Sequence, residues 1–321
     1  MTHDSSPRIR PENLAERPLQ VVTACRVRDL PVLKIAVERL RRHIPFGGVN
    51  VLAPDRDCAR IAARLRGQVN VIPENGFVPG MTIEQLRECR LEGFPRAAGW
   101  YFQQLLKLQF AFVDPEDDYY LIWDADTVPL RPLRFFDPAG RMLLTKAQEH
   151  YLPYFETYRS LFGTEPHREF SFIAQHILVQ KSVAREMLSR IEQRVPGTGN
   201  WAWKLMRALP STGKNLFSEY ETYGHYIKNY HPERVVFVER PWQRAITHYT
   251  GRPIPKEKEL EHLARRYDYA AFERVYSGWR RVAYSLLARI RGRPAKPRSP
   301  GVPPEADADI PDAEGKPSAR D

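Results

Sequence analysis

The sequence predicts an α/β protein in which a mixed sheet is flanked by helices. Short runs rich in β-branched residues alternate with longer segments of helical periodicity, which is typical of a sheet with covering helices. The 321 residues are 42% apolar, enough to bury one large core. No run of 18 apolar residues occurs and the N-terminus lacks the apolar core of a signal peptide, so we expect a cytoplasmic protein without a membrane span.

The individual elements follow from the period of the apolar residues and from the turn residues between them. Strands, which are short apolar runs, are expected at residues 19–24, 49–53, 69–72, 119–123, 142–145, 172–180 and 235–238. Helices, in which apolar residues recur at helical spacing, are expected at residues 30–43, 83–90, 99–112 and 182–194. A loop with Gly76, Pro79 and Gly80 separates the third strand from the helix that follows it.

The ends of the chain differ in composition from this core. We expect one domain at residues 18–254, preceded by a disordered segment at 1–17. Helices are expected at 255–292, the last of them basic and amphipathic. Residues 293–321 are Pro-rich and then acidic, and we expect them to be disordered.

The carboxyl ends of the expected strands should meet at one rim of the sheet. In open α/β sheets ligands bind beyond these ends. The residues that would fall on the rim are Thr23, Cys25, Arg26, Ala53, Asp55, Asn75 and Asp126. Among them Thr23, Arg26 and Asn75 are candidates for binding a nucleotide.

Two carboxylates one residue apart follow the apolar run of residues 119–123. At a fraying strand end the backbone can turn so that Asp124 and Asp126 converge on one cation, and oxygen ligands favour Mg²⁺ or Mn²⁺. Asp124 would sit deeper, near the nucleotide, and Asp126 would meet the metal more directly. The alternative is a buried strand that ends in a solvated, Asp-rich turn.

Two classes of enzyme place such a motif after an apolar strand. In nucleotide-sugar glycosyltransferases the carboxylates hold a metal against a diphosphate. In haloacid-dehalogenase-like phosphatases Asp124 would be the nucleophile, Asp126 the general acid or base, and later carboxylates would hold Mg²⁺. The sequence disfavours the phosphatase, because no acidic pair follows on a plausible strand and the motif does not open the domain.

Polar residues interrupt two apolar segments elsewhere. Gln104 and Lys107 share one face of the helix expected at 99–112, where Lys107 could neutralise a phosphate or simply be solvated. Gln175 and His176 lie inside an apolar run and need hydrogen-bond partners or a ligand. His176 is thus either a catalytic residue or a core histidine whose hydrogen bonds are made within the protein.

The segment at residues 217–226 combines aromatic residues with carboxylates. Aromatic faces can stack on the apolar side of a pyranose, and Glu219 or Glu221 could take the proton from an acceptor hydroxyl. On a helix these two acids point roughly opposite ways, so we expect at most one to be catalytic. Ser218 is also placed to cap the N-terminus of this helix, with the acids in its first turn.

A histidine and a glycine lie close together near the end of the expected domain. At a strand end, His248 could complete the metal sphere, and Gly251 would let backbone amides approach a diphosphate. An ordinary surface turn is the alternative.

The net charge of +10 is concentrated in one segment. Residues 277–300 contain seven basic residues and no acid, so we do not expect a nucleic-acid partner. Within 275–298 an apolar stripe is flanked by arginines, which fits either peripheral contact with the inner face of an anionic membrane or docking on the chain's own domain. Three cysteines without metal spacing fit reduced thiols.

Four segments together resemble a bacterial glycosyltransferase-like family, the DUF6492 type, which has the GT-A fold. The resemblance spans about residues 20–249 and rests on residues 99–107, 124–126, 171–176 and 218–224. It implies a metal-dependent transferase that uses a nucleotide-diphosphate sugar, with Asp124 and Asp126 at the metal and nucleotide. Separately, His248 and Gly251 look like the histidine-glycine motif of glycogenin-type transferases, whose histidine binds manganese, although Arg252 and Pro253 depart from that motif.

The sequence therefore predicts a glycosyltransferase of the nucleotide-diphospho-sugar transferase superfamily, with Mn²⁺ or Mg²⁺ as cofactor. Its acceptor would be a carbohydrate or glycolipid, as in the synthesis of surface polysaccharides. A phosphatase and a non-catalytic module that binds nucleotides or an anionic surface are the alternatives.

Overall fold

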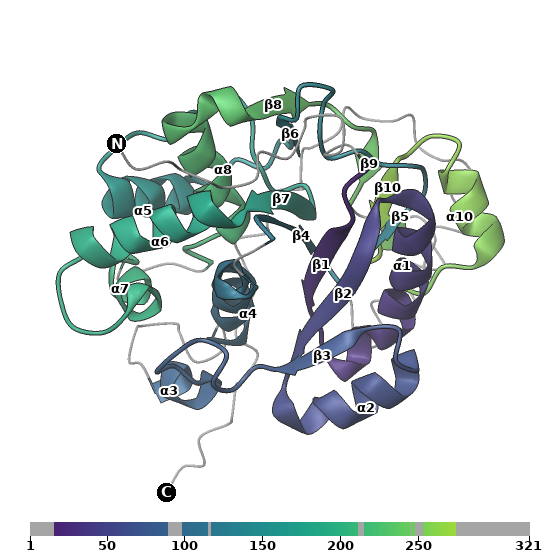
Figure 1. The fold of residues 1–321 in the computed structure, drawn as a ribbon, viewed down its shortest axis with the longest axis horizontal. Helices are drawn as coiled ribbons and strands as arrows, with labels where there is room; N and C mark the ends of the chain where they lie inside the picture. The colour runs from purple at the N-terminus through teal and green to yellow at the C-terminus, as the bar shows by residue number, and fades with distance from the viewer. Residues whose placement is uncertain are drawn as a thin grey trace, which may run out of the picture.

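A five-stranded sheet forms the centre of the computed structural model, which describes residues 16–88, 98–114, 117–210, 215–244, 246–247 and 253–273. The strands lie in the order β3-β2-β1-β4-β7, and only β7 is antiparallel to its neighbour (Figure 1). Their bounds are β1 Leu19–Ala24, β2 Phe46–Ala53, β3 Asn70–Pro73, β4 Tyr119–Trp123 and β7 His176–Gln180.

The middle strands, β1 and β4, are buried on both faces, as their apolar sequences require. Val21 of β1 is in register with Val49 of β2 on one side and with Leu121 of β4 on the other. The strand order reverses between β1 and β4, so this pair marks the topological switch point of the sheet. Ligands of open α/β sheets bind beside the carboxyl ends of the strands at such a point.

Helices cover the sheet on both sides (Figure 1). In Figure 1, α1 and α2 accompany β1 to β3, whereas α5, α6 and α8 gather on the side of β7. The longer helices are α1 Leu30–His43, α2 Asp55–Leu65, α4 Ala98–Gln109, α5 Leu152–Phe162, α6 Lys181–Arg194 and α8 Glu219–Tyr230. The short ones are η2 Val27–Asp29, α3 Ile83–Glu88, η3 Phe110–Phe112, α7 Trp201–Arg207, η4 Pro232–Arg234 and α10 Glu257–Leu263.

Two small sheets flank the main one. One has the order β5-β10-β9, with β5 Thr127–Pro129, β9 Trp242–Gln243 and β10 Tyr269–Ala271. The other pairs β6 Met142–Thr145 with β8 Val235–Val238. Strand β10 lies antiparallel to β5, and the Phe272 amide donates to the Asp126 carbonyl at 2.8 Å. The C-terminal part of the described chain therefore supports the turn that carries Asp126.

The elements agree closely with the predictions wherever the apolar period is clear. The bounds of β1, α1, β6 and β8 are those expected from the sequence. Strand β7 begins at His176, later than the expected residue 172, because Gln175 has a positive φ of 64° that breaks the extended chain before it. Helices α2, α5 and α7 were not expected, and β10 lies in a region for which only helices were predicted.

Membrane contact and terminal disorder were predicted for segments that fall mostly outside the described residues, namely 1–15 and 274–321. In the part of the chain that the structure describes, no helix is both long and apolar enough to span a membrane.

Candidate functional site

Asp124 and Asp126 project from a tight turn between β4 and β5. The turn is closed by a hydrogen bond of 3.0 Å from the Thr127 amide to the Asp124 carbonyl. Below it, the buried indole of Trp123 donates to the Thr127 carbonyl at 2.7 Å. The Asp124 amide donates to the Gln175 carbonyl at 3.0 Å, which ties the turn to the start of β7. Both acids are thus held at the switch point of the sheet.

Asp124 belongs to a network of charged and polar side chains contributed by α4 and α8. Lys107 Nζ lies 2.7 Å from Asp124 Oδ1 and 2.8 Å from Glu219 Oε1. The Tyr220 hydroxyl donates to Asp124 Oδ1 at 2.8 Å. The Asp124 side chain is 24% exposed, whereas those of Lys107 and Glu219 are 5% and 4% exposed. Asp124 is therefore the partly exposed member of this network, and the ion pair of Lys107 with Glu219 is buried.

The protonation of this network follows from competition between burial and Coulomb attraction. Burial alone would lower the pKa of Lys107, but the carboxylates of Asp124 and Glu219 outweigh it and raise that pKa above its usual value. Burial raises the pKa of Glu219, and the neighbouring Lys107 opposes this rise. Lys107 is therefore a permanent cation held between two acids.

The first turn of α8 is fixed from two directions. Ser218 caps the helix by accepting a hydrogen bond from the Glu221 amide, as predicted. Gln104 Oε1 of α4 accepts a hydrogen bond of 3.0 Å from the Glu219 amide, and its Nε2 donates to the Trp100 carbonyl. Gln104 thus positions Glu219 through its backbone.

Asp126 has a different electrostatic environment from Asp124. Burial raises its pKa to about 7, and the acids Asp124, Glu273 and Asp29 add to the rise. No lysine or arginine among the described residues forms an ion pair with Asp126. The carboxyl of Asp126 therefore lacks a compensating charge that a bound cation would supply.

The two acids fit a divalent metal by the chemistry of their donor atoms. Both offer hard oxygen ligands, and Asp126, whose pKa is raised by burial and by neighbouring acids, has no ion pair with a lysine or arginine of the described residues. Within the described ranges no group of three His, Cys, Asp or Glu residues could hold a metal. A two-carboxylate set suits Mg²⁺ or Mn²⁺, since Mg²⁺ is commonly held by one or two carboxylates together with substrate phosphates and water.

Glu221 lies on the opposite side of α8 from Glu219, as the helical spacing predicted. Its Oε1 accepts from the Ser171 hydroxyl and from the Phe172 amide, and its Oε2 lies 2.9 Å from His225 Nε2. All of these groups are buried. The structure therefore places Glu221 in the core, away from Asp124, and its predicted catalytic role is not supported by this position.

The aromatic side chains of the segment 217–226 also lie in the core. The side chains of Phe217, Tyr220, Tyr223 and Tyr226 are at most 4% exposed. The sequence-based expectation that these rings stack on a sugar is wrong, because they fill the space between α8 and its neighbours. Only the Tyr220 hydroxyl reaches the site.

His176 and Gln175 are buried beside the turn. The imidazole of His176 stacks on Trp123 with ring centroids 5.0 Å apart and lies 3.3 Å from the Thr145 hydroxyl. Burial lowers its pKa to about 3, so this histidine is neutral. Of the two interpretations of His176, the structure matches the core histidine; Gln175 contributes its backbone carbonyl to Asp124.

Three of the predicted nucleotide-binding residues, Thr23, Arg26 and Asn75, lie at or just beyond the carboxyl ends of β1 and β3. Thr23 is buried in β1. Arg26 is exposed, and its guanidinium packs against Gly99 of α4. A Cβ atom added at residue 99 would lie 2.4 Å from the nearest guanidinium nitrogen. The Asn75 amide donates to Asp55 at 3.1 Å. His248 and Gly251 lie outside the described residues, so their predicted roles stay predictions.

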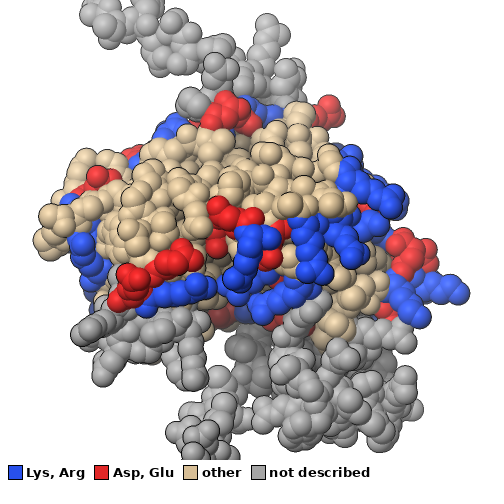
Figure 2. Space-filling model, turned by 90° about the horizontal axis from the view of Figure 1, so that it is seen from below, with Lys and Arg blue, Asp and Glu red and all other residues tan. Residues whose placement is uncertain are grey.

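Charged side chains gather on the face near this end of the sheet. Helices α2 and α3, which follow β2 and β3, lie at the bottom of Figure 1. Seen from below, Lys and Arg side chains form a band across the middle of the face, with Asp and Glu side chains among them (Figure 2). A face rich in basic side chains attracts anionic ligands such as phosphates.

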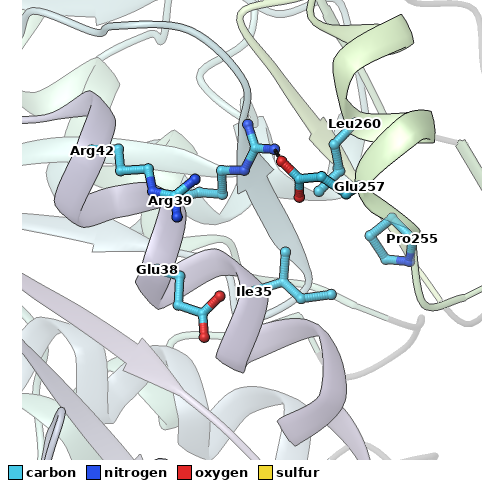
Figure 3. A pocket seen from close by; sticks show the side chains of 7 residues that line it. All are labelled: Ile35, Glu38, Arg39, Arg42, Pro255, Glu257 and Leu260. Atoms are coloured by element: carbon cyan, nitrogen blue, oxygen red, sulfur yellow. Dashed lines mark hydrogen bonds and ion pairs between the residues drawn. The ribbon is translucent and has the colours of Figure 1, made fainter.

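A separate pocket lies between α1 and α10, away from these residues. Arg39 and Glu257 point toward one another across it and form an ion pair (Figure 3). Its lining consists of Ile35, Glu38, Arg39, Arg42, Pro255, Glu257 and Leu260. None of the predicted site residues lines this pocket, which is a seam between the two helices.

Sequence reasoning missed a second polar cluster beside the site. Arg244, just after β9, forms ion pairs with Glu149 and with Glu273, the latter at 2.7 Å. The Glu273 carboxylate contributes to the raised pKa of Asp126, so the cluster lies near the turn. No local spacing could have revealed this, because the three residues come from distant parts of the chain.

The fold and the site together define a mixed α/β protein with two carboxylates at the switch point of a mainly parallel sheet. The chain belongs to a family of unknown function, DUF6492, whose model matches residues 18–261. No curated protein matches the chain.

Several solved structures match most of the chain at low sequence identity. The galactosyltransferase LgtC, solved with donor and acceptor sugar analogues, is 11% identical, with a TM-score of 0.37 over 85% of this chain and 96% of that one. Mouse xyloside xylosyltransferase 1 is 12% identical, with a TM-score of 0.41 over 79% and 96% of the two chains. A 4-diphosphocytidyl-2C-methyl-D-erythritol synthase from Anaerococcus prevotii is 11% identical, with a TM-score of 0.35 over 70% and 88%. Similarity at this level does not establish a shared activity.

Proposed function

We propose that this protein is a metal-dependent glycosyltransferase that moves a sugar from a nucleotide-diphosphate donor to an acceptor hydroxyl. The observation that carries the proposal is the pair Asp124 and Asp126 at the switch point of the sheet. Asp124 is oriented by Lys107 and Tyr220, whereas Asp126 has no cationic partner among the described residues. This is the arrangement needed to hold a divalent cation against a diphosphate.

Asp124 and Asp126 would hold the metal, which when bound neutralises charge on the departing nucleoside diphosphate. The protein's own contribution is to orient the acids before the donor arrives. Lys107 fixes Asp124 Oδ1 from below, and the Trp123 indole and the Gln175 carbonyl fix the backbone of the turn. Such preorganisation lowers the barrier because little rearrangement is needed during the reaction.

Of the two acids proposed to take the acceptor proton, Glu219 is the one that contacts the Asp124 network. Its pKa is raised by burial, which makes its carboxylate a stronger base than an ordinary glutamate. In this role it would take the hydroxyl proton as the acceptor oxygen attacks the anomeric carbon. Glu219 also holds Lys107 in place, so its substitution is expected to affect donor binding as well.

The donor nucleotide would lie along the carboxyl ends of β1 to β3. Arg26, which is exposed, follows β1, and Asn75 follows β3, with β2 between these two strands. Thr23 is buried beneath and would shape this rim without reaching solvent. The cofactor in this proposal is Mn²⁺ or Mg²⁺, and the acceptor is a carbohydrate or a glycolipid.

The phosphatase alternative has less support. It requires further carboxylates around Asp124 to complete a magnesium site, and the described residues offer no third ligand for such a cluster. Asp124 Oδ1, one of its two nucleophilic oxygens, is already bonded to Lys107 and Tyr220.

Calorimetric titration with UDP, GDP and CDP, with and without Mn²⁺, tests the proposal. We expect one nucleotide to bind far more tightly with Mn²⁺ and Asp126→Asn to abolish that gain, weakening metal-dependent binding by about 100-fold. The same variant should lose sugar transfer while remaining folded. Glu192→Gln, which changes an exposed acid on α6, serves as the matched control and should behave as wild type. Binding that is equally tight without metal, or in Asp126→Asn, would contradict the proposal.

A further inference from the structure

We propose that Tyr151 is the platform on which a carbohydrate acceptor stacks, and that Glu149 and Arg244 bond to its hydroxyls. The inference rests on the proposed glycosyltransferase function and assigns the acceptor side of the same site. It is carried by one exposed aromatic ring, by the contact of this ring with Tyr154, which lies near Glu219, and by the ion pair of the neighbouring Glu149 with Arg244.

Tyr151 is accessible where the other aromatic residues near the site are not. It is 36% exposed, and Leu152 beside it is 59% exposed; both are among the few exposed large apolar side chains of the described ranges. Together they form a small apolar surface at the N-terminal end of α5. Neighbouring exposed apolar groups of this kind mark binding surfaces more often than isolated ones do.

The surface adjoins the Glu219 network through the packing of α5. The Thr157 hydroxyl donates to the Leu216 carbonyl at 2.6 Å, and the Leu216 amide donates to the Tyr101 hydroxyl at 2.8 Å. Leu216 lies three residues before Glu219, so the middle of α5 is held against that part of the chain. Tyr154, one turn before Thr157, lies edge-on to Tyr151 with ring centroids 4.9 Å apart.

The electrostatics of Tyr154 agree with this placement. Burial raises the pKa of its phenol, and the carboxylates of Glu149 and Glu219 raise it further. Tyr154 is thus a neutral hydroxyl near both acids. It links the exposed ring of Tyr151 to the candidate base.

Glu149, two residues before Tyr151, belongs to a cluster of charged groups suited to sugar hydroxyls. Arg244 pairs with Glu149 and with Glu273, and all three side chains remain partly exposed. A guanidinium offers several donors and a carboxylate several acceptors, so the cluster can bond to neighbouring hydroxyls of one sugar. An aromatic face with a few polar groups beside it matches the apolar and polar sides of a pyranose.

The segment that carries Tyr151 is held in place before any ligand binds. Ala147 forms backbone hydrogen bonds of 2.8 and 2.9 Å with Ser171, whose hydroxyl donates to Glu221. The two ring nitrogens of His150 lie 3.1 Å from the Gln148 carbonyl and 3.0 Å from the Arg168 carbonyl. A platform that is already ordered loses little entropy on binding.

The experiment measures binding of the fluorescently labelled full chain to an array of mono- and oligosaccharides, with the tightest nucleotide and Mn²⁺ present. We expect the wild type to bind a subset of these glycans. Tyr151→Ala should weaken that binding by about tenfold or more, whereas Tyr151→Phe, which keeps the ring, should stay within about threefold. Phe112→Ala, which removes an exposed ring in η3, should behave as wild type.

Calorimetric titration of the same variants with the nucleotide separates two failures. If Tyr151→Ala binds nucleotide and glycans as the wild type does, the acceptor platform is wrong and the proposed function survives. If the wild type binds nucleotide but no glycan on the array, the carbohydrate platform is equally overturned. If no nucleotide binds the wild type, the proposed function itself fails.

Discussion

Lys107 balances the charge at the floor of the candidate site. It lies between Asp124 and Glu219, two acids that come from a turn and from a helix start far away in the sequence. Removal of one member of a buried ionic group leaves its partners without compensation, which costs more than replacement of the group as a whole.

We therefore predict strong coupling between Lys107 and Glu219. Lys107→Met alone should destabilise the protein by about 3–5 kcal/mol, because two acids lose their cation. Adding Glu219→Gln should restore about 1–3 kcal/mol of this loss, since one of the two acids left without a cation becomes neutral. Urea unfolding of the two single variants and the double variant measures the coupling. Additive losses would show that the ion pair contributes no net interaction.

Asp126 gives a stability prediction with a definite sign. Its pKa is raised from 3.8 to about 7 in the folded protein, so the folded state holds the proton more tightly than the unfolded chain. Its contribution to stability is therefore fully present below about pH 4 and is lost as pH rises toward 7. In EDTA, Asp126→Asn should have a higher Tm than the wild type at pH 7.5 and a similar Tm at pH 4.

Mn²⁺ should reverse this order at neutral pH. The metal would raise the Tm of the wild type but not that of Asp126→Asn, since a ligand that binds only the folded state stabilises it. Thermal unfolding at three pH values, with EDTA and with Mn²⁺, provides the measurement. Equal melting temperatures of the two proteins in EDTA at all pH values would contradict the assigned environment of Asp126.

At the scale of elements, helix α8 shows what local sequence can and cannot predict. Its start at Ser218 and the opposite directions of Glu219 and Glu221 follow from capping preference and helical geometry. Which acid faces the site depends on Lys107 and Ser171, which belong to other elements. The sequence also could not show whether the aromatic side chains of α8 point to solvent or to the core. A helix that is buried on nearly all sides has no polar face from which this direction could be inferred.

Gly224 determines how closely α8 can approach the segment before β7. A Cβ at this residue would lie 2.1 Å from the ring of Phe172, so the ring packs directly on the helix backbone. We predict that Gly224→Ala destabilises the protein by about 1–3 kcal/mol through overpacking, although alanine favours a helix by about 1 kcal/mol.

A second substitution tests whether this contact is the cause. Phe172→Leu should be less damaging in the Gly224→Ala background than in the wild type, because the smaller side chain leaves room for the methyl group. Chemical unfolding of the four proteins gives the comparison. If Gly224→Ala is as stable as the wild type, the close approach does not constrain the helix.

At the scale of the whole molecule, the strands of the main sheet and the strands β6 and β8 were predictable, whereas the small sheet of β5, β10 and β9 was not. The strands of the main sheet are apolar runs, and the parallel pairing of β1 to β4 follows from their alternation with helices, whereas β7 is antiparallel. Strands β5, β9 and β10 contain only two or three residues each, and their pairing brings together parts of the chain that carry no common pattern. For the same reason, Arg244 and Glu273 could not be assigned to the site from the sequence.

The segment beyond the expected domain boundary at residue 254 is predicted to be essential for stability. Ala270 is buried in β10 between β5 and β9, so Ala270→Asp should cost about 3 kcal/mol or more by burying an unpaired charge. Glu261→Ala on the exposed side of α10 is the matched control and should leave the Tm within about 2 °C of wild type. Equal stability of the Ala270→Asp variant would mean that this segment is an appendage.

The pairing of β10 with β5 also determines when, during synthesis of the chain, the turn with Asp126 can reach its final structure. The turn with Asp126 leaves the ribosome early, but the strand that supports it, and the Phe272 amide that bonds to the Asp126 carbonyl, follow only about 140 residues later. A nascent chain therefore exposes its two carboxylates for much of translation without the geometry to use them. The proposed metal site would therefore be complete only after residue 272 has been made, so metal binding by the nascent chain would begin late in synthesis.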